Sequence, residues 1–259
     1  MNKIIRIAIG TEPRTIIAQK VLEYSILSQT KSVVNFYPLM GEDYYDRGNF
    51  GEGTGFSLLR FGVPELFNYK GGAIYLDADM LVLTDIAELW NLLKDPKPAV
   101  WCTIGNENKN SYETSVMLIN CQKAKDTIKT IEEIKMYLKD DVEQKKYREI
   151  MKLQYLKQKP TELSRWWNVM DKRSLKTSLN DFSNPRAKLL HFTDVRKQPW
   201  NYPDHPKKDI WGKWLKKAIK DDYILMTEVK DAISKYDISN PRRPNGLHIS
   251  WEKYILGKK

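Results

Sequence analysis

One apolar run in the chain is interrupted by two acidic residues, and this feature restricts the fold more than any other. The run covers residues 73–83 and is typical of a buried β-strand, except for Asp77 and Asp79. Because an unpaired carboxylate is costly to bury, something must hold the two charges where the strand ends. They are either structural acids with hydrogen-bond partners or ligands of a hard cation such as Mg²⁺ or Mn²⁺.

The order of the apolar segments predicts an α/β fold. Short apolar runs alternate with segments of helical periodicity. The expected strands are residues 4–9, 33–39, 73–79, 99–104 and 115–121, and the expected helices are 14–29, 56–67, 85–93, 123–158 and 209–219. This alternation predicts a mostly parallel sheet with helices on both faces. Ligands of such sheets bind beyond the carboxyl ends of the strands, where Asp77 and Asp79 lie.

The sequence also predicts a long surface loop, a bent helix and a single domain. Residues 41–55 contain five glycines and several acids, which favours a surface loop. Pro64 is expected to bend the helix at 56–67. The length of 259 residues fits a single domain.

The charge of the chain is uneven. Residues 1–120 contain 11 Lys and Arg against 14 Asp and Glu, whereas residues 121–259 contain 32 against 19, so the net charges are −3 and +13. A basic region of this kind suits an acidic acceptor, nucleic acid or an anionic membrane surface, although scattered lysines on solvated helix faces are the simpler interpretation.

No stretch has the roughly 18 to 20 uncharged apolar residues of a membrane span, and the N-terminus has a strand pattern rather than that of a signal peptide. The expected location is therefore cytoplasmic, with peripheral contact at the inner face of a membrane left open. Cys102 and Cys121 lie in apolar runs without metal-ligand spacing, so we expect reduced core residues.

Several short motifs of the sequence resemble those of a known protein family, in the same order along the chain. Residues 74–82 (IYLDADMLV) are similar to the Asp-x-Asp strand of GT-A-fold glycosyltransferases, particularly glycosyltransferase family 8. Other motifs of that family follow in the same order: residues 9–12 (IGTE), 57–60 (SLLR), 114–120 (TSVMLIN), 190–193 (LHFT) and 197–200 (KQPW). The resemblance implies a GT-A, Rossmann-like sheet flanked by helices, with a helical and irregular C-terminal extension. It also implies one catalytic domain, in which residues 1–121 bind nucleotide and metal and residues 122–259 close the site on the acceptor side.

The resemblance also implies an activity, which is metal-dependent transfer of a sugar from a nucleotide diphosphate, most simply a UDP-sugar. Asp77, Asp79 and His191 would be the ligands of Mn²⁺ or Mg²⁺. Arg60 and Lys197 would face the diphosphate. The remaining nucleotide contacts would come from the first turn and from between the acids: Gly10, Thr11, Glu12 and Ala78.

The resemblance does not directly identify the catalytic residues, because the chain departs from the family pattern at the motifs expected to contact the sugar. Residues 113–115 (ETS) replace an Asn-x-Gly, Gln198 interrupts a Lys-Pro-Trp signature, and the usual Asp-Gln pair has no clear counterpart. Glu149, Asn168 and Asp171 are the candidates for contact with the sugar. The family implies retention at the anomeric carbon, but no positioned nucleophile is evident, so an ion-pair-like front-face route stays open.

Two other functions compete. A nucleotidyltransferase also needs acidic metal ligands, but it should have a phosphate loop richer in glycine than residues 10–14. The basic second half with its tryptophans could form a nucleic-acid-binding module, which we set aside because the aromatics occupy positions typical of a core. The acceptor, whether glycan, lipid-linked sugar or protein, and the donor sugar are not readable from the sequence.

Overall fold

The computed structural model describes residues 4–41, 56–105, 111–138, 144–171, 182–237 and 246–256. The chain forms two compact units that interleave along the sequence. The first unit contains Met1–Glu12, Lys31–Asp77 and Ile86–Asn168, and the second contains Pro13–Thr30, Ala78–Asp85 and Val169–Lys259. The chain therefore passes from the first unit to the second between Asp77 and Ala78. The division at residue 121 stays a prediction, and the expected loop at 41–55 lies almost wholly outside the described residues.

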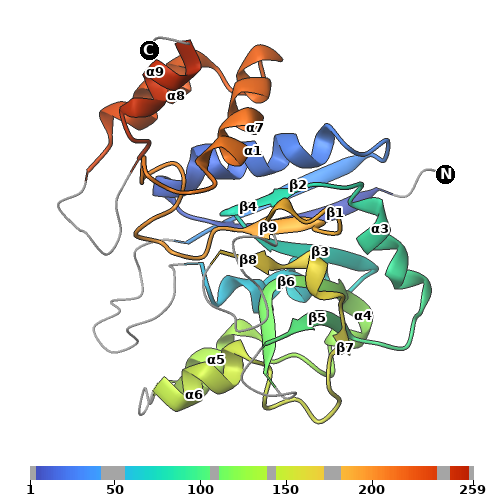
Figure 1. The fold of residues 1–259 in the computed structure, drawn as a ribbon. Helices are drawn as coiled ribbons and strands as arrows, with labels where there is room; N and C mark the ends of the chain where they lie inside the picture. Colours follow the sequence, from blue (N-terminus) through green and yellow to red (C-terminus); the bar gives the residue numbers. More distant parts are fainter. Residues whose placement is uncertain are drawn as a thin grey trace. The chain divides into compact units, whose positions relative to one another are not determined.

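A six-stranded sheet organises the first unit, in the order β2-β1-β3-β6-β5-β7 (Figure 1). Its strands are β1 (Ile5–Thr11), β2 (Val34–Met40), β3 (Gly72–Asp77), β5 (Val100–Ile104), β6 (Tyr112–Asn120) and β7 (Thr161–Glu162). The β1–β2, β1–β3 and β5–β7 pairs are parallel, whereas β6 is antiparallel to both of its neighbours. The predicted α/β fold with a mixed, mostly parallel sheet is thus confirmed.

The described part of the first unit also contains short helices. They are η2 (Leu59–Gly62), α2 (Val63–Leu66), α3 (Ala87–Trp90), η3 (Asn91–Lys94), α4 (Cys121–Ala124), α5 (Ile131–Leu138), α6 (Gln144–Met151) and η4 (Arg165–Trp167). Buried residues of α4, α5 and α6, including Ile134, Leu138 and Ile150, join the core beside Tyr75 and Met117 of the sheet. Both cysteines are free and buried, as predicted, and burial raises the pKa of the Cys121 thiol to about 11.

Three expected elements differ from those observed. The helix at 56–67 is split into a turn, η2 and α2, and Pro64 lies in the first turn of α2, where a missing N–H group costs nothing. The helical pattern at 123–158 is divided among separate short helices. The strand at 73–79 ends at Asp77, since the chain then leaves the large sheet for β4 (Met80–Val82) in a second sheet.

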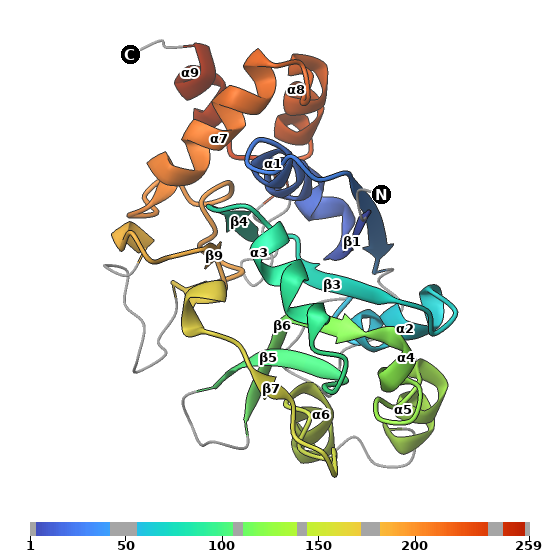
Figure 2. The ribbon, with the colours of Figure 1, turned by 90° about the vertical axis from the view of Figure 1, so that its right-hand side faces the viewer.

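In its described residues, the second unit combines that small sheet with four α-helices. The sheet has the order β4-β9-β8, with β9 (Leu189–His191) antiparallel to β4 and parallel to β8 (Val169–Met170). Helix α1 (Ile16–Leu27) follows the short η1 (Pro13–Thr15) and lies beside α7 (Lys208–Lys220) and α8 (Met226–Ser234) (Figure 2). Side chains fix this arrangement: Lys20 pairs with Glu228, and Tyr223 Oη donates a hydrogen bond to Glu23 Oε2 over 2.7 Å.

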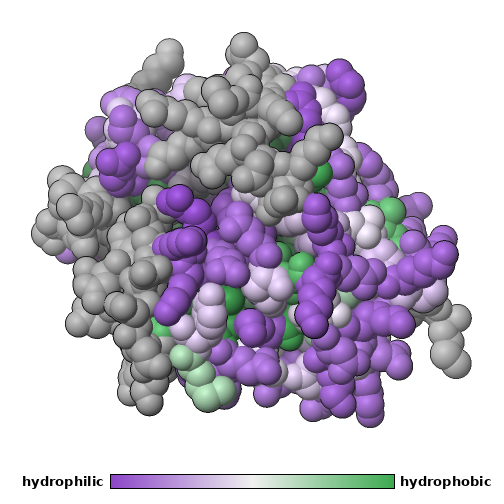
Figure 3. Space-filling model, turned by 90° about the horizontal axis from the view of Figure 1, so that it is seen from below, coloured by the Kyte–Doolittle hydropathy of each residue, from purple (hydrophilic) through white to green (hydrophobic). Residues whose placement is uncertain are grey.

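Aromatic rings fill the centre of the second unit. The ring of Trp211 from α7 lies 5.6 Å from that of Trp200 and 5.0 Å from that of Trp251 in α9 (Ser250–Leu256). The amphipathic helix predicted at 209–219 is therefore present as α7, and its tryptophan serves the core. Among the coloured residues in Figure 3, hydrophilic ones (purple) predominate, with some hydrophobic ones (green) between them. Within the described residues, no helix combines the length and the hydropathy needed to cross a bilayer.

Candidate metal and nucleotide site

The first acid of the pair lies at the end of β3, and its charge is compensated. Asp77 is 8% exposed. Its Oδ1 accepts a hydrogen bond from Tyr75 Oη over 2.7 Å and another from Arg60 Nη2 over 3.1 Å. Tyr75 and Asp77 are two residues apart on one strand, so their side chains share a face of the sheet. A buried carboxylate with these partners is stable as a charged group.

Arg60 is itself fixed in the first unit. Its Nε donates to the Ser57 carbonyl over 2.7 Å, and its Nη1 donates to Thr114 Oγ1 over 3.0 Å. Thr114 in turn donates to the carbonyl of Met151 over 2.9 Å. Arg60 is 4% exposed. The guanidinium predicted to face the donor is thus anchored against Asp77, and its contact with a diphosphate stays a prediction.

Gly10 of β1 lies opposite Asp77 in the strand register. A Cβ atom at this position would lie 2.1 Å from Tyr75 Oη and 2.5 Å from the ring of Phe56. The glycine therefore makes room for the tyrosine that binds Asp77. Thr11 and Glu12 follow it and are buried, at 0% and 5% exposure. The nucleotide contacts expected of these three residues stay predictions.

The second acid, in the second unit, has different surroundings. Gln198 is 1% exposed, and its Nε2 donates to Asp79 Oδ2 over 2.8 Å and to the Phe192 carbonyl over 2.9 Å. The backbone carbonyl of Asp79 accepts from the N–H of Phe192 over 2.9 Å. One oxygen of the Asp79 carboxylate is thereby held in a fixed direction.

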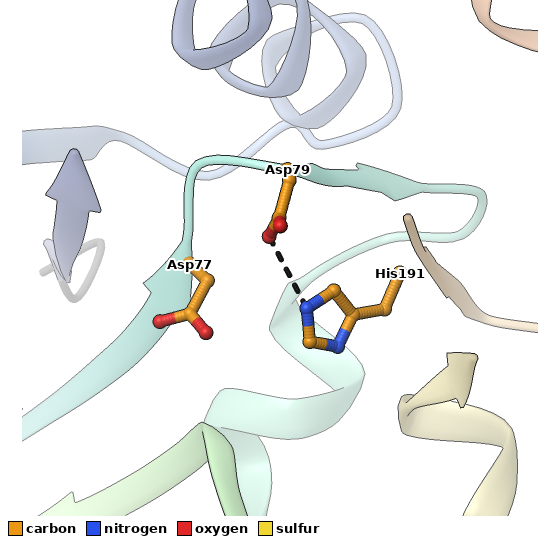
Figure 4. A group of neighbouring side chains, drawn as sticks. All are labelled: Asp77, Asp79 and His191. Carbon is orange, nitrogen blue, oxygen red and sulfur yellow. Dashed lines mark ion pairs between the residues drawn. The ribbon is translucent and has the colours of Figure 1, made fainter. Parts of the chain in front are cut away.

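The other oxygen of Asp79 faces His191. The antiparallel pairing of β4 with β9 sets Met80 opposite His191, which brings the imidazole next to the acid. His191 Nε2 lies 3.2 Å from Asp79 Oδ1 (Figure 4). That oxygen is buried and has no hydrogen-bond partner among the described residues, so the close approach lacks hydrogen-bond geometry. A buried carboxylate oxygen left in this state is costly unless a ligand satisfies it.

Asp77, Asp79 and His191 form the cluster expected from the sequence. One ligand atom from each residue lies within 4.8 Å of the others. Two carboxylates and one imidazole are a donor set that suits Mn²⁺, or Mg²⁺ with more water, and leaves positions open for phosphate oxygens. The residues therefore fit a divalent cation, both by their chemistry and by the unpartnered Asp79 Oδ1. Ala78, which joins the two acids, is 1% exposed.

The other predicted residues are each engaged elsewhere. Asn168 is 3% exposed, and its Nδ2 donates to Ser115 Oγ over 3.1 Å. Glu149 lies on α6 and accepts from Tyr137 Oη over 3.1 Å. Lys197 is exposed, with Nζ 5.5 Å from the centre of the Tyr202 ring. None of these three residues belongs to the metal cluster.

Asp171 stabilises the segment that follows His191. Its Oδ1 accepts from both the N–H and the Oγ1 of Thr193 over 2.8 Å, and its Oδ2 lies 3.4 Å from His205 Nε2. The N–H of Asp171 donates to the His191 carbonyl over 3.1 Å. The carboxylate thus orders the chain around the metal-cluster histidine, and its contact with a sugar stays a prediction.

The sequence interpretation missed Gln198 and Tyr75. In the sequence, Gln198 only interrupts a Lys-Pro-Trp signature, whereas in the structure its side-chain amide donates a hydrogen bond to Asp79. No pattern in one sequence could link residues 79 and 198. Tyr75 was read as part of an apolar strand; its spacing of two from Asp77 was the available signal, because i and i+2 on a strand point to the same face.

Several solved structures share this fold. The chain aligns with the WbbM bifunctional glycosyltransferase at a TM-score of 0.61, 11% identity, 88% of this chain and 52% of that one. The galactosyltransferase LgtC, solved with donor and acceptor sugar analogs, aligns at a TM-score of 0.59 and 12% identity, over 82% of this chain and 96% of LgtC. GlyE of Streptococcus pneumoniae TIGR4 aligns at a TM-score of 0.58 and 15% identity, over 86% of this chain and 64% of the GlyE chain. The fold is thus that of the GT-A glycosyltransferases.

The sequence comparison identifies the family. The model of the family described as "Glycosyl transferase family 8" matches residues 28–204, which is most of the chain. The chain belongs to glycosyl transferase family 8. A stretch of 107 residues is also 36% identical to Protein CDI of Arabidopsis thaliana, covering 39% of this chain and 41% of that protein. The chain thus matches less than half of the length of this curated relative.

Proposed function

We propose that the chain transfers a sugar from a nucleotide diphosphate, a UDP-sugar, to an acceptor hydroxyl with retention at the anomeric carbon, and that Mn²⁺ or Mg²⁺ is required. The observation that carries this proposal is the buried Asp79 Oδ1, which lies beside His191 Nε2 and has no hydrogen-bond partner among the described residues. In a member of family 8, an orphaned oxygen within a cluster of acids and imidazole is best explained by a cation that holds a diphosphate.

The chain's own groups would prepare the leaving group. Asp77, Asp79 and His191 would hold the cation, and when bound it would supply positive charge to the diphosphate leaving group. Arg60 fixes the direction of the Asp77 carboxylate, because its guanidinium is buried and bonded on several sides. Lys197 has an exposed ammonium that serves as a point charge for the departing diphosphate.

The nucleotide and sugar contacts follow from the same reaction. The backbone of residues 10–12 and Ala78 borders the nucleotide. Asn168 is buried, and so is the side chain of Asp171. Both hold neighbouring residues in place, which favours a positioning role near the sugar. Glu149 is bonded to Tyr137 of the preceding helix, so it is the weakest candidate of the three. Asn168→Ala, Asp171→Ala and Glu149→Ala, measured for kcat and KM, rank them.

A product assay tests the reaction. The chain is incubated with Mn²⁺, a panel of UDP-sugars and acceptors of the three classes that the charge permits: glycans, lipid-linked sugars and proteins. Release of free UDP with transfer of the sugar supports the proposal, and NMR of the anomeric proton tests retention. In a parallel incubation with UTP and a sugar 1-phosphate, formation of a UDP-sugar and pyrophosphate, without release of UDP from UDP-sugars, would contradict it and indicate a nucleotidyltransferase instead.

A further inference from the structure

Strand β9 ends at His191, and one residue of the second unit, Asp171, holds the chain directly after it from two sides. The carboxylate oxygen Oδ1 of Asp171 accepts from the N–H and from Oγ1 of Thr193, each over 2.8 Å. The N–H of Asp171 donates to the His191 carbonyl over 3.1 Å. Asp171 directly follows β8, the parallel partner of β9. The backbone on both sides of Phe192 is therefore tied to one residue at the end of the neighbouring strand.

A buried histidine contacts the remaining oxygen of Asp171. His205 is 5% exposed, and its Nε2 lies 3.4 Å from Asp171 Oδ2. Its Nδ1 accepts from the N–H of Lys207 over 3.1 Å, so in the neutral ring the proton lies on Nε2 and points to the carboxylate. Both nitrogens of the imidazole are thus engaged, one by the backbone and the other by Asp171.

Packing also fixes the imidazole of His205 against the metal-cluster segment. Its ring lies 5.6 Å from the ring of Phe192, and the two planes meet edge to face at 73°. Phe192 is 0% exposed, and its N–H donates to the Asp79 carbonyl over 2.9 Å. His205 therefore packs on the residue directly after the metal-cluster histidine, in addition to its contact with Asp171.

We propose that Asp171 and His205 form a clamp that positions the imidazole of His191 for the cation, an inference that rests on the proposed function because it takes His191 as a ligand. His191 Nε2 lies 3.2 Å from Asp79 Oδ1 (Figure 4), and this direction depends on the backbone from which the ring projects. The clamp fixes that backbone at the His191 carbonyl and at the N–H of Thr193. Asp171 and His205 are thus positioning residues of the metal site. Losing such supporting groups typically costs 10- to 100-fold in metal affinity.

NMR of histidine-labelled protein tests the positioning without metal, because the chain has three histidines and each ring signal can be assigned. Asp171→Asn keeps the shape of the side chain, but an amide has one acceptor oxygen and cannot serve both Thr193 and His205. In Asp171→Asn and His205→Leu we expect the His191 signal to broaden or split, because the ring samples several directions. His205→Gln keeps an N–H donor and should restore a single signal. An unchanged His191 signal in Asp171→Asn and His205→Leu would overturn the proposal.

Titration calorimetry with Mn²⁺ links the clamp to the cation. Asp171→Asn and His205→Leu should each weaken Mn²⁺ binding by about tenfold, and His205→Gln should regain most of the affinity. His248→Leu is the matched control, because His248 Nδ1 also accepts from the N–H two residues later, that of Ser250, while its ring packs on Tyr236. This control should keep the wild-type affinity. Equal losses in His205→Leu and His248→Leu would overturn the proposal.

Failure of the clamp and failure of the proposed reaction give different results. If the wild-type chain binds no Mn²⁺, the proposed reaction is contradicted, and the histidine signals still decide whether the clamp orients His191. If the wild-type chain binds Mn²⁺ and Asp171→Asn binds it equally tightly, the reaction stands and the clamp is refuted. Thr193→Val removes only the Oγ1 bond to Asp171, and it gives the same decision if His205→Leu does not fold.

Discussion

Asp77 and Asp79 are two residues apart, yet the two units give them opposite surroundings. Asp77 in the first unit is bonded to Tyr75 and to the guanidinium of Arg60. Asp79 in the second unit has one oxygen bonded to an uncharged amide and the other without a hydrogen-bond partner among the described residues. We propose that the contrast reflects a division of work: Asp77 pairs with groups that the fold already supplies, whereas a cation would satisfy Asp79.

The largest effect is expected from Asp79→Asn on catalysis. The change keeps the shape of the side chain and removes the charge that a cation would need. Loss of metal assistance, worth several kcal/mol, should lower kcat/KM by about a thousandfold or more in the transfer assay. Asp95→Asn, at an exposed turn of the first unit, is the control. A decrease of less than tenfold for Asp79→Asn would show that this acid is not a metal ligand.

The free energy of unfolding should depend on the surroundings of Asp77 more than on those of Asp79. Arg60→Met removes the guanidinium from a buried ion pair, and we expect the free energy of unfolding in urea to fall by about 3–5 kcal/mol. Asp79→Asn should change it by less than about 1 kcal/mol in metal-free protein, because an amide oxygen can still accept from Gln198. Arg196→Met, at an exposed arginine paired with Asp194, should stay within about 0.5 kcal/mol. Equal costs at Arg60 and Arg196 would disprove the contrast.

Gln198 should affect metal affinity rather than folding alone. Gln198→Met keeps the volume but removes the N–H group that orients Asp79, and losses of such supporting groups typically cost 10- to 100-fold in metal affinity. Titration calorimetry with Mn²⁺ measures this without any turnover. Gln29→Met is the control, because Gln29 also donates to backbone, at Val82 of β4, but does not touch the acid. Lower thermal stability with unchanged Mn²⁺ affinity would reduce Gln198 to a structural residue.

The smallest effect is expected at Tyr75. Tyr75→Phe removes one hydrogen bond to Asp77 and leaves Arg60 in place, so the free energy of unfolding should fall by about 1 kcal/mol. Mn²⁺ affinity should change by no more than a few fold. A loss of metal binding as large as that of Asp79→Asn would mean that Asp77 depends on the phenol for its position, and that the two acids are more alike than proposed.

The sequence predicted the α/β class because strand and helix periodicities are local signals. It also predicted that His191 lies beside Asp77 and Asp79, but only through a family resemblance, because more than a hundred residues separate the histidine from the acids. The split of the run at Asp77 could not be predicted, since β4 leaves the large sheet to pair with β9, a non-local event. The roles of Arg60 and Gln198 likewise depend on which side chains the fold brings together.

The central claim is that Asp79 is poised for a cation, and Mn²⁺-dependent binding of UDP tests it most directly. In a calorimetric titration, wild-type protein and Arg196→Met should bind UDP with Mn²⁺ and lose that affinity when the cation is chelated. Asp79→Ala should bind UDP equally weakly with and without Mn²⁺. Unchanged, Mn²⁺-dependent affinity in Asp79→Ala would contradict the account.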